Sequence, residues 1–251
     1  MKNCNIYKGR ENFYKGRIVK NMELKENERL DNLGNGYSVI QKIDGYCFTS
    51  DSVELAKFVA FKESGGGLKH GDVIIDFCSG SGIVGFMLAG YAKGLSINLK
   101  QIVNVELQTE YYARAKRSTE YNKLESLMSN LNLDVKDTES INNALSGSNI
   151  ATVITCNPPY MPFNNQPINL KQDVAIARHE IAITLECIFA SASKLLQTGG
   201  RFYLIHKSDR LADIFHYGRI HKLEIKQVKL IRAGLVLVRA IKDAKAGVSV
   251  S

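Results

Sequence analysis

Long apolar segments are missing from this chain of 251 residues. No run reaches the roughly 18 apolar residues that a membrane-spanning helix requires. The first thirty residues are polar and charged, and no apolar stretch follows their basic residues, which argues against a signal peptide. We therefore expect a cytoplasmic protein that has no membrane partner.

Cysteine is also scarce, and its spacing excludes two kinds of site. The five cysteines are odd in number, widely spaced and never arranged as CxxC. This pattern predicts reduced thiols in a cytoplasmic protein, neither a disulfide framework nor a zinc site, and no metal is expected. The cysteines are Cys4, Cys47, Cys78, Cys156 and Cys187.

Proline is scarcer still, and its distribution is uneven. The chain has four prolines, and all of them fall within ten residues, just after the apolar run 149–155. They are Pro158, Pro159, Pro162 and Pro167. Because proline fixes its own φ angle and has no N–H, we expect one loop whose role depends on a rigid backbone.

Acidic residues are rare at the two ends of the chain. Residues 1–20 hold six Lys or Arg against one acid, and residues 201–251 hold eleven against four. Because the whole chain has a net charge of +8, residues 21–200 carry a net charge of −4. Basic ends around a mildly acidic middle suit a polyanion, first of all nucleic acid. The alternative is a hydrated surface that binds nothing.

The chain does have enough apolar residues for a substantial core, at 45% of the total. From residue 72 onward, strand patterns alternate with helical patterns, which is typical of a mostly parallel, doubly wound sheet. Strands are expected at 73–77, 101–106, 131–135, 149–155 and 201–206, followed by an antiparallel pair at 222–231 and 234–241. Helices are expected at 53–60, from 83 onward, at 108–124, at 137–145 and at 178–196, the last ended by Gly199-Gly200. The predicted fold is therefore an α/β, Rossmann-like, seven-stranded sheet in a domain of residues 31–251, preceded by a basic extension of residues 1–30.

Two local signals precede this sheet. Asn35-Gly36 before an apolar strand predicts a hairpin turn, because this pair tolerates positive φ angles. Ser50 or Asp51 is expected to cap the helix that follows.

A glycine-rich turn follows the first strand of the sheet, in the sequence Asp76-Phe-Cys-Ser-Gly80-Ser-Gly82. Its glycines allow a tight turn and close approach of a ligand, and the helix behind it offers free N–H groups to an anion. The spacing D-x-x-x-G-x-G matches neither the usual nicotinamide fingerprint nor the phosphate loop that ends in G-K-[ST]. By itself the turn could be only a tight connection.

Carboxylates at the next two strand ends strengthen the case for a ligand. Glu106 ends the second strand and Asp134 lies at the end of the third. In a sheet of this kind an acid at the tip of strand two can hold the two hydroxyls of a ribose. An acid after strand three can accept from the exocyclic amine of adenine.

The order of these motifs, with Asn157-Pro-Pro-Tyr160 after the fourth strand, resembles the S-adenosylmethionine-dependent class I methyltransferases that act on planar nitrogens. The flanking segments are similar to the bacterial tRNA (adenine-N6)-methyltransferase family that acts on adenosine 37 of valine tRNA, over roughly residues 24–245. These segments are Glu28-Arg-Leu-Asp-Asn-Leu33, Val39-Ile-Gln41, Phe48-Thr-Ser-Asp51, Ala177-Arg-His-Glu180 and Gly199-Gly-Arg-Phe202. The resemblance implies S-adenosylmethionine as cofactor and tRNA as partner. It implies a cofactor site made of Phe48, Thr49, Asp51, Asp76, Ser79, Gly80, Gly82, Glu106, Leu107, Asp134, Val135 and Asn157.

The proline loop then has a chemical explanation. Adenine N6 is a poor nucleophile, because its lone pair is delocalised into the ring. The Asn157 side-chain carbonyl and the Pro158 backbone carbonyl can accept its two N–H groups, and fixed dipoles of this kind stabilise the charge that develops during transfer. Tyr160 offers a face for stacking of a base that has been swung out, with Pro159 beside it.

Other expected contacts have open alternatives. The repeated Tyr-Lys-Gly-Arg units supply Lys8, Arg10, Lys15 and Arg17 for phosphate contacts, or are a coincidence. Phe48, Thr49 and Asp51 form part of a cofactor lid or only a helix cap. Arg178 binds the substrate backbone, or its segment caps a helix and fastens the loop 163–177.

Several rival functions remain open at this stage. The same loop could methylate a glutamine amide in a protein such as a release factor, guanine N2 in ribosomal RNA, or adenine in DNA. A rival of another class is an RNA-binding scaffold that keeps the fold without catalysis. The basic ends favour RNA, and a monomer or weak homodimer is expected.

Overall fold

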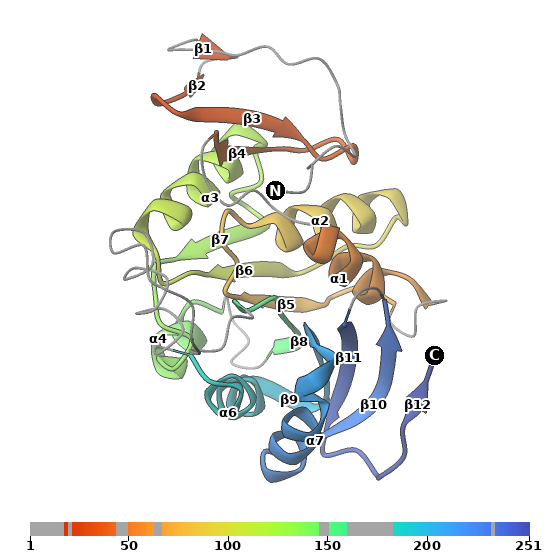
Figure 1. The fold of residues 1–251 in the computed structure, drawn as a ribbon. Coiled ribbons are helices and arrows are strands. Elements are labelled where there is room, and N and C mark those ends of the chain that lie inside the picture. The colour runs from red at the N-terminus through yellow and green to blue at the C-terminus, as the bar shows by residue number, and fades with distance from the viewer. Residues whose placement is uncertain are drawn as a thin grey trace.

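An eight-stranded sheet forms the centre of the protein in a computed structural model that describes residues 18–19, 22–43, 50–62, 67–145, 151–159, 183–231 and 234–251. The strand order is β12-β10-β11-β9-β8-β5-β6-β7 (Figure 1). The bounds are β5 Val73–Phe77, β6 Gln101–Val105, β7 Met128–Leu131, β8 Ala151–Cys156, β9 Leu196–Lys207, β10 Leu223–Leu230, β11 Leu235–Lys242 and β12 Ser249–Val250.

The pairing confirms the predicted fold class. Strands β5 to β9 run parallel, and β11 is antiparallel to both β9 and β10. The seven predicted strands are present, and the two-residue strand β12 adds a parallel eighth at the edge of β10. Every residue of β5 and of β6 is buried, as expected for strands that are covered on both faces.

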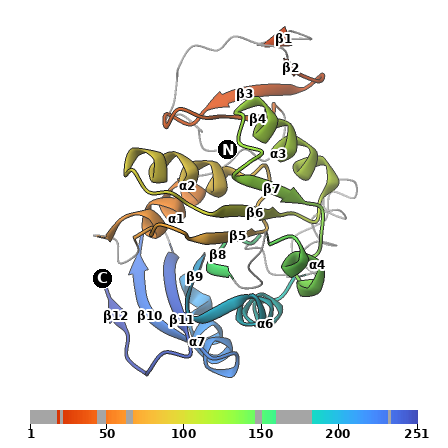
Figure 2. The same cartoon turned by 180° about the vertical axis from the view of Figure 1, so that it is seen from behind.

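Helices cover both faces of the sheet (Figures 1 and 2). Alternate strand residues face opposite layers, so Ile74 packs in the cluster that includes α1 and α2, whereas Ile75 packs with residues of α4, α6 and α7. Helix α7, between β9 and β10, was not predicted. The helices are α1 Ser50–Ala60, α2 Ile83–Gly94, α3 Thr109–Tyr121, α4 Thr138–Asn143, α6 Leu185–Leu195 and α7 Leu211–Ile220, with the short 3₁₀ helix η2 Ser208–Arg210.

Helix α1 carries its apolar residues at the predicted spacing, but its predicted cap is wrong. Because α1 already begins at Ser50, both Ser50 and Asp51 lie in its first turn. Leu55 and Val59 are fully buried, and the ring of Phe58 lies edge-on to Tyr203 of β9 at 5.7 Å. Helix α1 is therefore fixed to the body of the sheet.

The third strand was predicted three residues too late in the chain. Strand β7 pairs with β6 from Met128 to Leu131 and ends there. Beyond it, the Asn132 side-chain amide donates to the backbone carbonyls of Glu106 and Leu107, at 3.0 and 2.9 Å. The chain thus leaves the ladder at Asn132, and Asp134 lies beyond the strand.

The helix predicted at 178–196 begins later than expected, whereas its end agrees with the prediction to within one residue. Helix α6 begins at Leu185, because Thr184 is extended and its side chain accepts the Cys187 N–H at 3.2 Å. It ends at Leu195, since Leu196 is already in extended conformation and starts β9. Gly199 therefore lies inside β9, with a φ of +76°.

Two small hairpins precede the sheet. Strand β1 (Ile18–Val19) pairs with β2 (Met22–Glu23), and β3 (Glu28–Asn32) pairs with β4 (Ser38–Lys42). The hairpin predicted at Asn35-Gly36 is confirmed, but its connection spans residues 33–37 in place of a two-residue turn. The predicted boundary after residue 30 falls inside β3, and the division of the chain into extension and domain stays a prediction.

The β3–β4 hairpin is attached to α3. Side chains of α3 and its end accept from the β4 backbone, Ser118 from Ile40 at 2.9 Å and Asn122 from Ser38 at 3.0 Å. Arg117 donates to the buried carboxylate of Glu28 at 2.7 Å. The chain is therefore anchored at β4 on one side of the predicted lid and at α1 on the other. Within the described ranges, no helix combines the length and apolar character needed to cross a bilayer.

Candidate active site

The glycine turn follows β5 at the carboxyl edge of the sheet. Cys78, Gly80 and Gly82 all have positive φ angles, of 54°, 56° and 82°. A Cβ added at Gly80 would meet no atom of the described residues within 4 Å, so the backbone there faces space that these residues leave open. At Gly82 a Cβ would lie 3.0 Å from Asn104 Nδ2 and 3.1 Å from the Phe86 ring. Gly80 thus leaves room for a ligand, whereas Gly82 allows close packing at the start of α2.

Glu106 connects this turn to the end of β6. Its Oε2 accepts the Gly80 N–H at 2.8 Å, and its Oε1 accepts the Gln108 N–H at 2.8 Å. The residue is 7% exposed. Backbone donors therefore hold the carboxylate of Glu106 against the glycine turn.

Asp76 is the most perturbed acid of this region. It is 1% exposed, and its Oδ1 accepts from the Thr155 hydroxyl at 2.6 Å. Its Oδ2 is buried and has no hydrogen-bond partner among the described residues. Burial raises the pKa of Asp76 from 3.8 to about 7; the Thr155 hydrogen bond opposes this shift, and the charge of Glu106 adds to it. A cation bound at Oδ2 would relieve this penalty.

Two hydroxyls of the same turn also lack partners. The Oγ atoms of Ser79 and Ser81 are buried and make no hydrogen bond to any described residue. Buried polar atoms without partners are rare in folded proteins. Together with Asp76 Oδ2 and the open space at Gly80, they fit a polar ligand.

Three predicted site residues follow β6 and β7, and the structure gives less support for their roles in the candidate site. Leu107 is 42% exposed. Asp134 accepts the Lys136 N–H at 2.9 Å and pairs with the Lys136 ammonium at 3.1 Å. Val135 is buried in the core. The carboxylate of Asp134 is therefore paired with Lys136. Asp134 lies on a short segment between β7 and α4, so the prediction that it ends a strand is wrong.

The proline loop begins where β8 ends. Phe77 and Cys156 are partners across β5 and β8, so Asn157 lies at the level of the glycine turn. The Asn157 Nδ2 donates to the Ser52 hydroxyl of α1 at 2.9 Å. Pro158 is buried and Pro159 exposed. The structure thus brings the end of β8, the glycine turn after β5 and the start of α1 to one edge of the sheet.

Two cysteines lie at this edge, and burial makes one of them, Cys156, a poor nucleophile. The thiol of Cys156 lies next to that of Cys78. Burial above all, and then this contact, raise the pKa of Cys156 well above its usual 9.0. The thiolate of Cys156 is therefore disfavoured.

Several predicted contacts fall outside the described residues. They are Lys8, Arg10, Lys15, Arg17, Phe48, Thr49, Tyr160 and Arg178. Asp51 is described and is 7% exposed in the first turn of α1. Sequence reasoning missed Ser52 and Thr155. The one sequence signal for Thr155 is its position at the end of the predicted strand 149–155, directly before Cys156.

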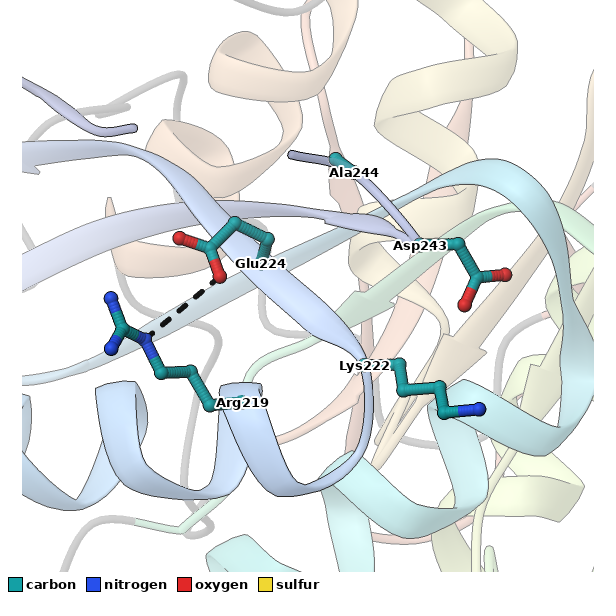
Figure 3. A pocket seen from close by; sticks show the side chains of 5 residues that line it. All are labelled: Arg219, Lys222, Glu224, Asp243 and Ala244. Atoms are coloured by element: carbon teal, nitrogen blue, oxygen red, sulfur yellow. Dashed lines mark ion pairs between the residues drawn. The ribbon is translucent and has the colours of Figure 1, made fainter. Parts of the chain in front are cut away.

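Cavities occur at the opposite edge of the sheet. One of about 320 Å³ is lined by Arg219, Lys222, Glu224, Asp243 and Ala244, with Arg219 Nε 4.0 Å from Glu224 Oε2 (Figure 3). Another of about 190 Å³ includes Asp72 and Thr152, near the amino ends of β5 and β8. Neither cavity includes a residue of the glycine turn. Among the described residues, no three His, Cys, Asp or Glu side chains are grouped so that they could hold a metal ion.

Comparisons with known proteins agree with this architecture. No family model matches the chain. The release factor glutamine methyltransferase of Bifidobacterium longum (strain NCC 2705) is 27% identical over 150 residues, which cover 55% of this chain and 49% of that protein. The chain thus spans about half the length of this curated relative.

Solved structures match over a larger part of the chain. The 16S rRNA N2 G1207 methyltransferase of Thermus thermophilus, in complex with AdoMet and guanosine, has a TM-score of 0.59 and 18% identity, covering 87% of this chain and 52% of that one. A predicted O-methyltransferase of Agrobacterium tumefaciens, Atu636, has a TM-score of 0.56 and 21% identity, covering 80% and 84%. The strand order and these similarities together show that the chain has the Rossmann-like fold of the class I methyltransferases.

Proposed function

We propose that this protein transfers a methyl group from S-adenosylmethionine to the exocyclic N6 of an adenine in tRNA, at adenosine 37 of valine tRNA. The observation that carries the proposal is the position of Asn157, held by its amide at the carboxyl end of β8 beside the glycine turn. The Asn-Pro-Pro-Tyr motif that starts there has the composition needed to activate a planar nitrogen.

The unpartnered polar atoms fit the cofactor. Asp76 would hold the ammonium of its methionine part, since Asp76 Oδ2 lacks a partner in the described structure and a cation favours the ionised acid. Glu106 would hold the ribose hydroxyls. Ser79, Gly80 and Gly82 would line the turn against which the ligand lies. When bound, S-adenosylmethionine supplies a methyl group made electrophilic by its sulfonium.

Four more residues complete the proposed cofactor site. Leu107, exposed after Glu106, would offer an apolar contact to the adenosine. Asp134 and the backbone of Val135 would form hydrogen bonds with the edge of the adenine of S-adenosylmethionine. For Asp134 this requires a change of partner, because its carboxylate is paired with Lys136. Asp51 at the start of α1, with Phe48 and Thr49 before it, would cover the cofactor.

The loop residues would act on the target amine. Asn157 Oδ1 and the Pro158 carbonyl would each accept one N–H, which favours pyramidal nitrogen and stabilises its developing positive charge. Proline at 158 and 159 provides no N–H that could compete for these carbonyls. Tyr160 would stack on the extruded base, worth about 1–3 kcal/mol.

Charge supports RNA as the substrate class. The basic arm 1–20 and the basic segment 201–251 suit a phosphate backbone. Lys8, Arg10, Lys15, Arg17 and Arg178 would add contacts with the tRNA. The choice of adenosine 37 and of valine tRNA depends on the resemblance of the flanking segments alone.

The second candidate is methylation of a glutamine amide in a release factor. It is favoured by the similarity to the Bifidobacterium longum enzyme. A glutamine amide is also a planar nitrogen with two N–H groups, so the same two acceptors would serve it.

One experiment separates the two candidates. The full-length protein is incubated with radiolabelled S-adenosylmethionine and either a valine tRNA transcript, the same transcript with guanosine at position 37, or a purified release factor. The proposal expects label only in the first, recovered as N6-methyladenosine after nuclease digestion and mass spectrometry. Label in the release factor alone would replace the proposal with the second candidate, and equal label in both transcripts would refute position 37.

A further inference from the structure

Ser52 of α1 contacts Asn157, the residue at which the proline loop begins. Its hydroxyl accepts a hydrogen bond from Asn157 Nδ2 at 2.9 Å, across 105 positions of sequence. Ser52 is 8% exposed, so water competes little for this hydroxyl. The contact is between two elements that approach each other only in the folded protein.

Helix α1 gives Ser52 a rigid support. Three residues later along the helix, Leu55 is fully buried, and Phe58 packs edge-on against Tyr203. The Ser52 hydroxyl is therefore held at a fixed place relative to the sheet. A hydrogen bond to a fixed acceptor restricts the side-chain rotamer of Asn157.

The direction of this hydrogen bond matters for the chemistry. An amide has a donor end and an acceptor end, and they point in different directions. With Nδ2 directed at Ser52, the carbonyl end of the amide points away from Ser52, and in the proposed function it is the end that accepts a substrate N–H. If the amide were flipped, its N–H groups would face the N–H groups of the substrate amine, which is unfavourable.

We infer that Ser52 is a positioning residue for methyl transfer, which orients the Asn157 amide so that its carbonyl accepts from the target amine. This inference rests on the proposed function, in which Asn157 is the catalytic acceptor. Ser52 itself does not touch the substrate or the cofactor in this scheme. Its effect should therefore appear in turnover and depend on Asn157.

The test compares Ser52→Thr with Ser52→Val. The two replacements have nearly the same shape, but only threonine keeps the hydroxyl. We expect Ser52→Thr to stay within about twofold of wild-type kcat, and Ser52→Val and Ser52→Ala to lose about tenfold, the usual effect of one hydrogen bond or a slightly misplaced group. S-adenosylmethionine affinity by calorimetry should stay unchanged. Val53→Ala, on the next residue of α1, serves as a control for loosening of the helix and should keep wild-type kcat.

Two further measurements distinguish positioning from a general structural role. Adding Ser52→Ala to Asn157→Ala should cost nothing more, because the group that Ser52 orients is already gone. In the protein without ligands, the side-chain amide resonances of Asn157 should shift in Ser52→Ala and stay in place in Val53→Ala.

The possible failures are distinguishable. If Asn157→Ala loses activity while Ser52→Ala keeps the wild-type kcat, the positioning role is refuted and the proposed function stands. Equal losses in Ser52→Thr and Ser52→Val, or a further loss on the Asn157→Ala background, would also refute it. Wild-type turnover of Asn157→Ala would refute the catalytic loop and the positioning role together.

Discussion

Replacing Asp76 by asparagine tests the environment of the candidate cofactor site without any ligand. The carboxyl group is 1% exposed, and burial raises its pKa from 3.8 to about 7. The folded protein therefore keeps its proton at pH values at which the unfolded chain has released it. Asparagine has the same shape, can still accept from Thr155, and carries no charge at any pH.

The sign and size of the effect follow from this shift. Below a pH of about 4 both states are protonated, so the group does not make stability pH-dependent. Between that pH and about 7, only the folded state is protonated, so stability falls by about 1.4 kcal/mol per pH unit. Above about 7 both states are ionised, and the full cost of about 4 kcal/mol has been reached.

Urea unfolding of the two proteins between about pH 5 and about pH 8 measures this term. We expect Asp76→Asn to gain about 3 kcal/mol relative to wild type over that interval, almost all of it below pH 7. A constant difference, such as the cost of an unpartnered amide Nδ2, does not change with pH and cancels from the comparison. A pH-independent difference for Asp76→Asn would refute the argument that burial raises the pKa of Asp76.

Further predictions concern ligands and catalysis. S-adenosylmethionine affinity should increase with pH up to about 7 and then level off, since a cation favours ionised Asp76; in Asp76→Asn, calorimetry should find weak binding without this dependence. Glu106→Ala should weaken the same affinity by about 1–3 kcal/mol, and unchanged calorimetry with an intact fold would remove Glu106 from the site. Asn157→Ala should lower kcat by about 10²–10³, whereas Asn157→Asp should retain more activity because a carboxylate still accepts an N–H. Single-turnover rates with saturating cofactor and a valine tRNA transcript measure both, and an equal loss in the two variants would contradict the acceptor role. Deleting residues 1–20 should flatten the dependence of log K on log salt for tRNA binding by about one unit or slightly less per lost phosphate contact; an unchanged slope would show that the arm contacts no phosphate.

Local patterns were sufficient for the parts of the fold that have strong local causes. Strands β5 and β6 are short, mostly apolar segments between turn residues, and their positions agree with the prediction to within one residue. The glycine turn and the start of α2 were equally clear, because positive φ angles demand particular residues. The antiparallel pair β10 and β11 was also located, since β10 alternates apolar with polar residues and β11 is largely apolar.

Only the tertiary structure decided the elements whose limits depend on distant partners. Strand β7 is located by its register with β6 and by the Asn132 amide, and a window of neighbouring residues contains neither. The start of α6 depends on Thr184, whose capping hydrogen bond competes with a longer helix.

The chemistry of the candidate site divides in the same way. The sequence shows which residue types the candidate site contains: two acids, two glycines and an asparagine before two prolines. Each is suited to its proposed role by its functional group. Their protonation states could not be predicted from the sequence, because a pKa depends on burial and on neighbouring charges. Asp76 acquires both only when β5 lies between β6 and β8. The contact between Ser52 and Asn157 likewise exists only because packing brings α1 to the end of β8. Sequence thus determined which groups are present, and tertiary structure decided their protonation and direction, since both depend on atoms far apart along the chain.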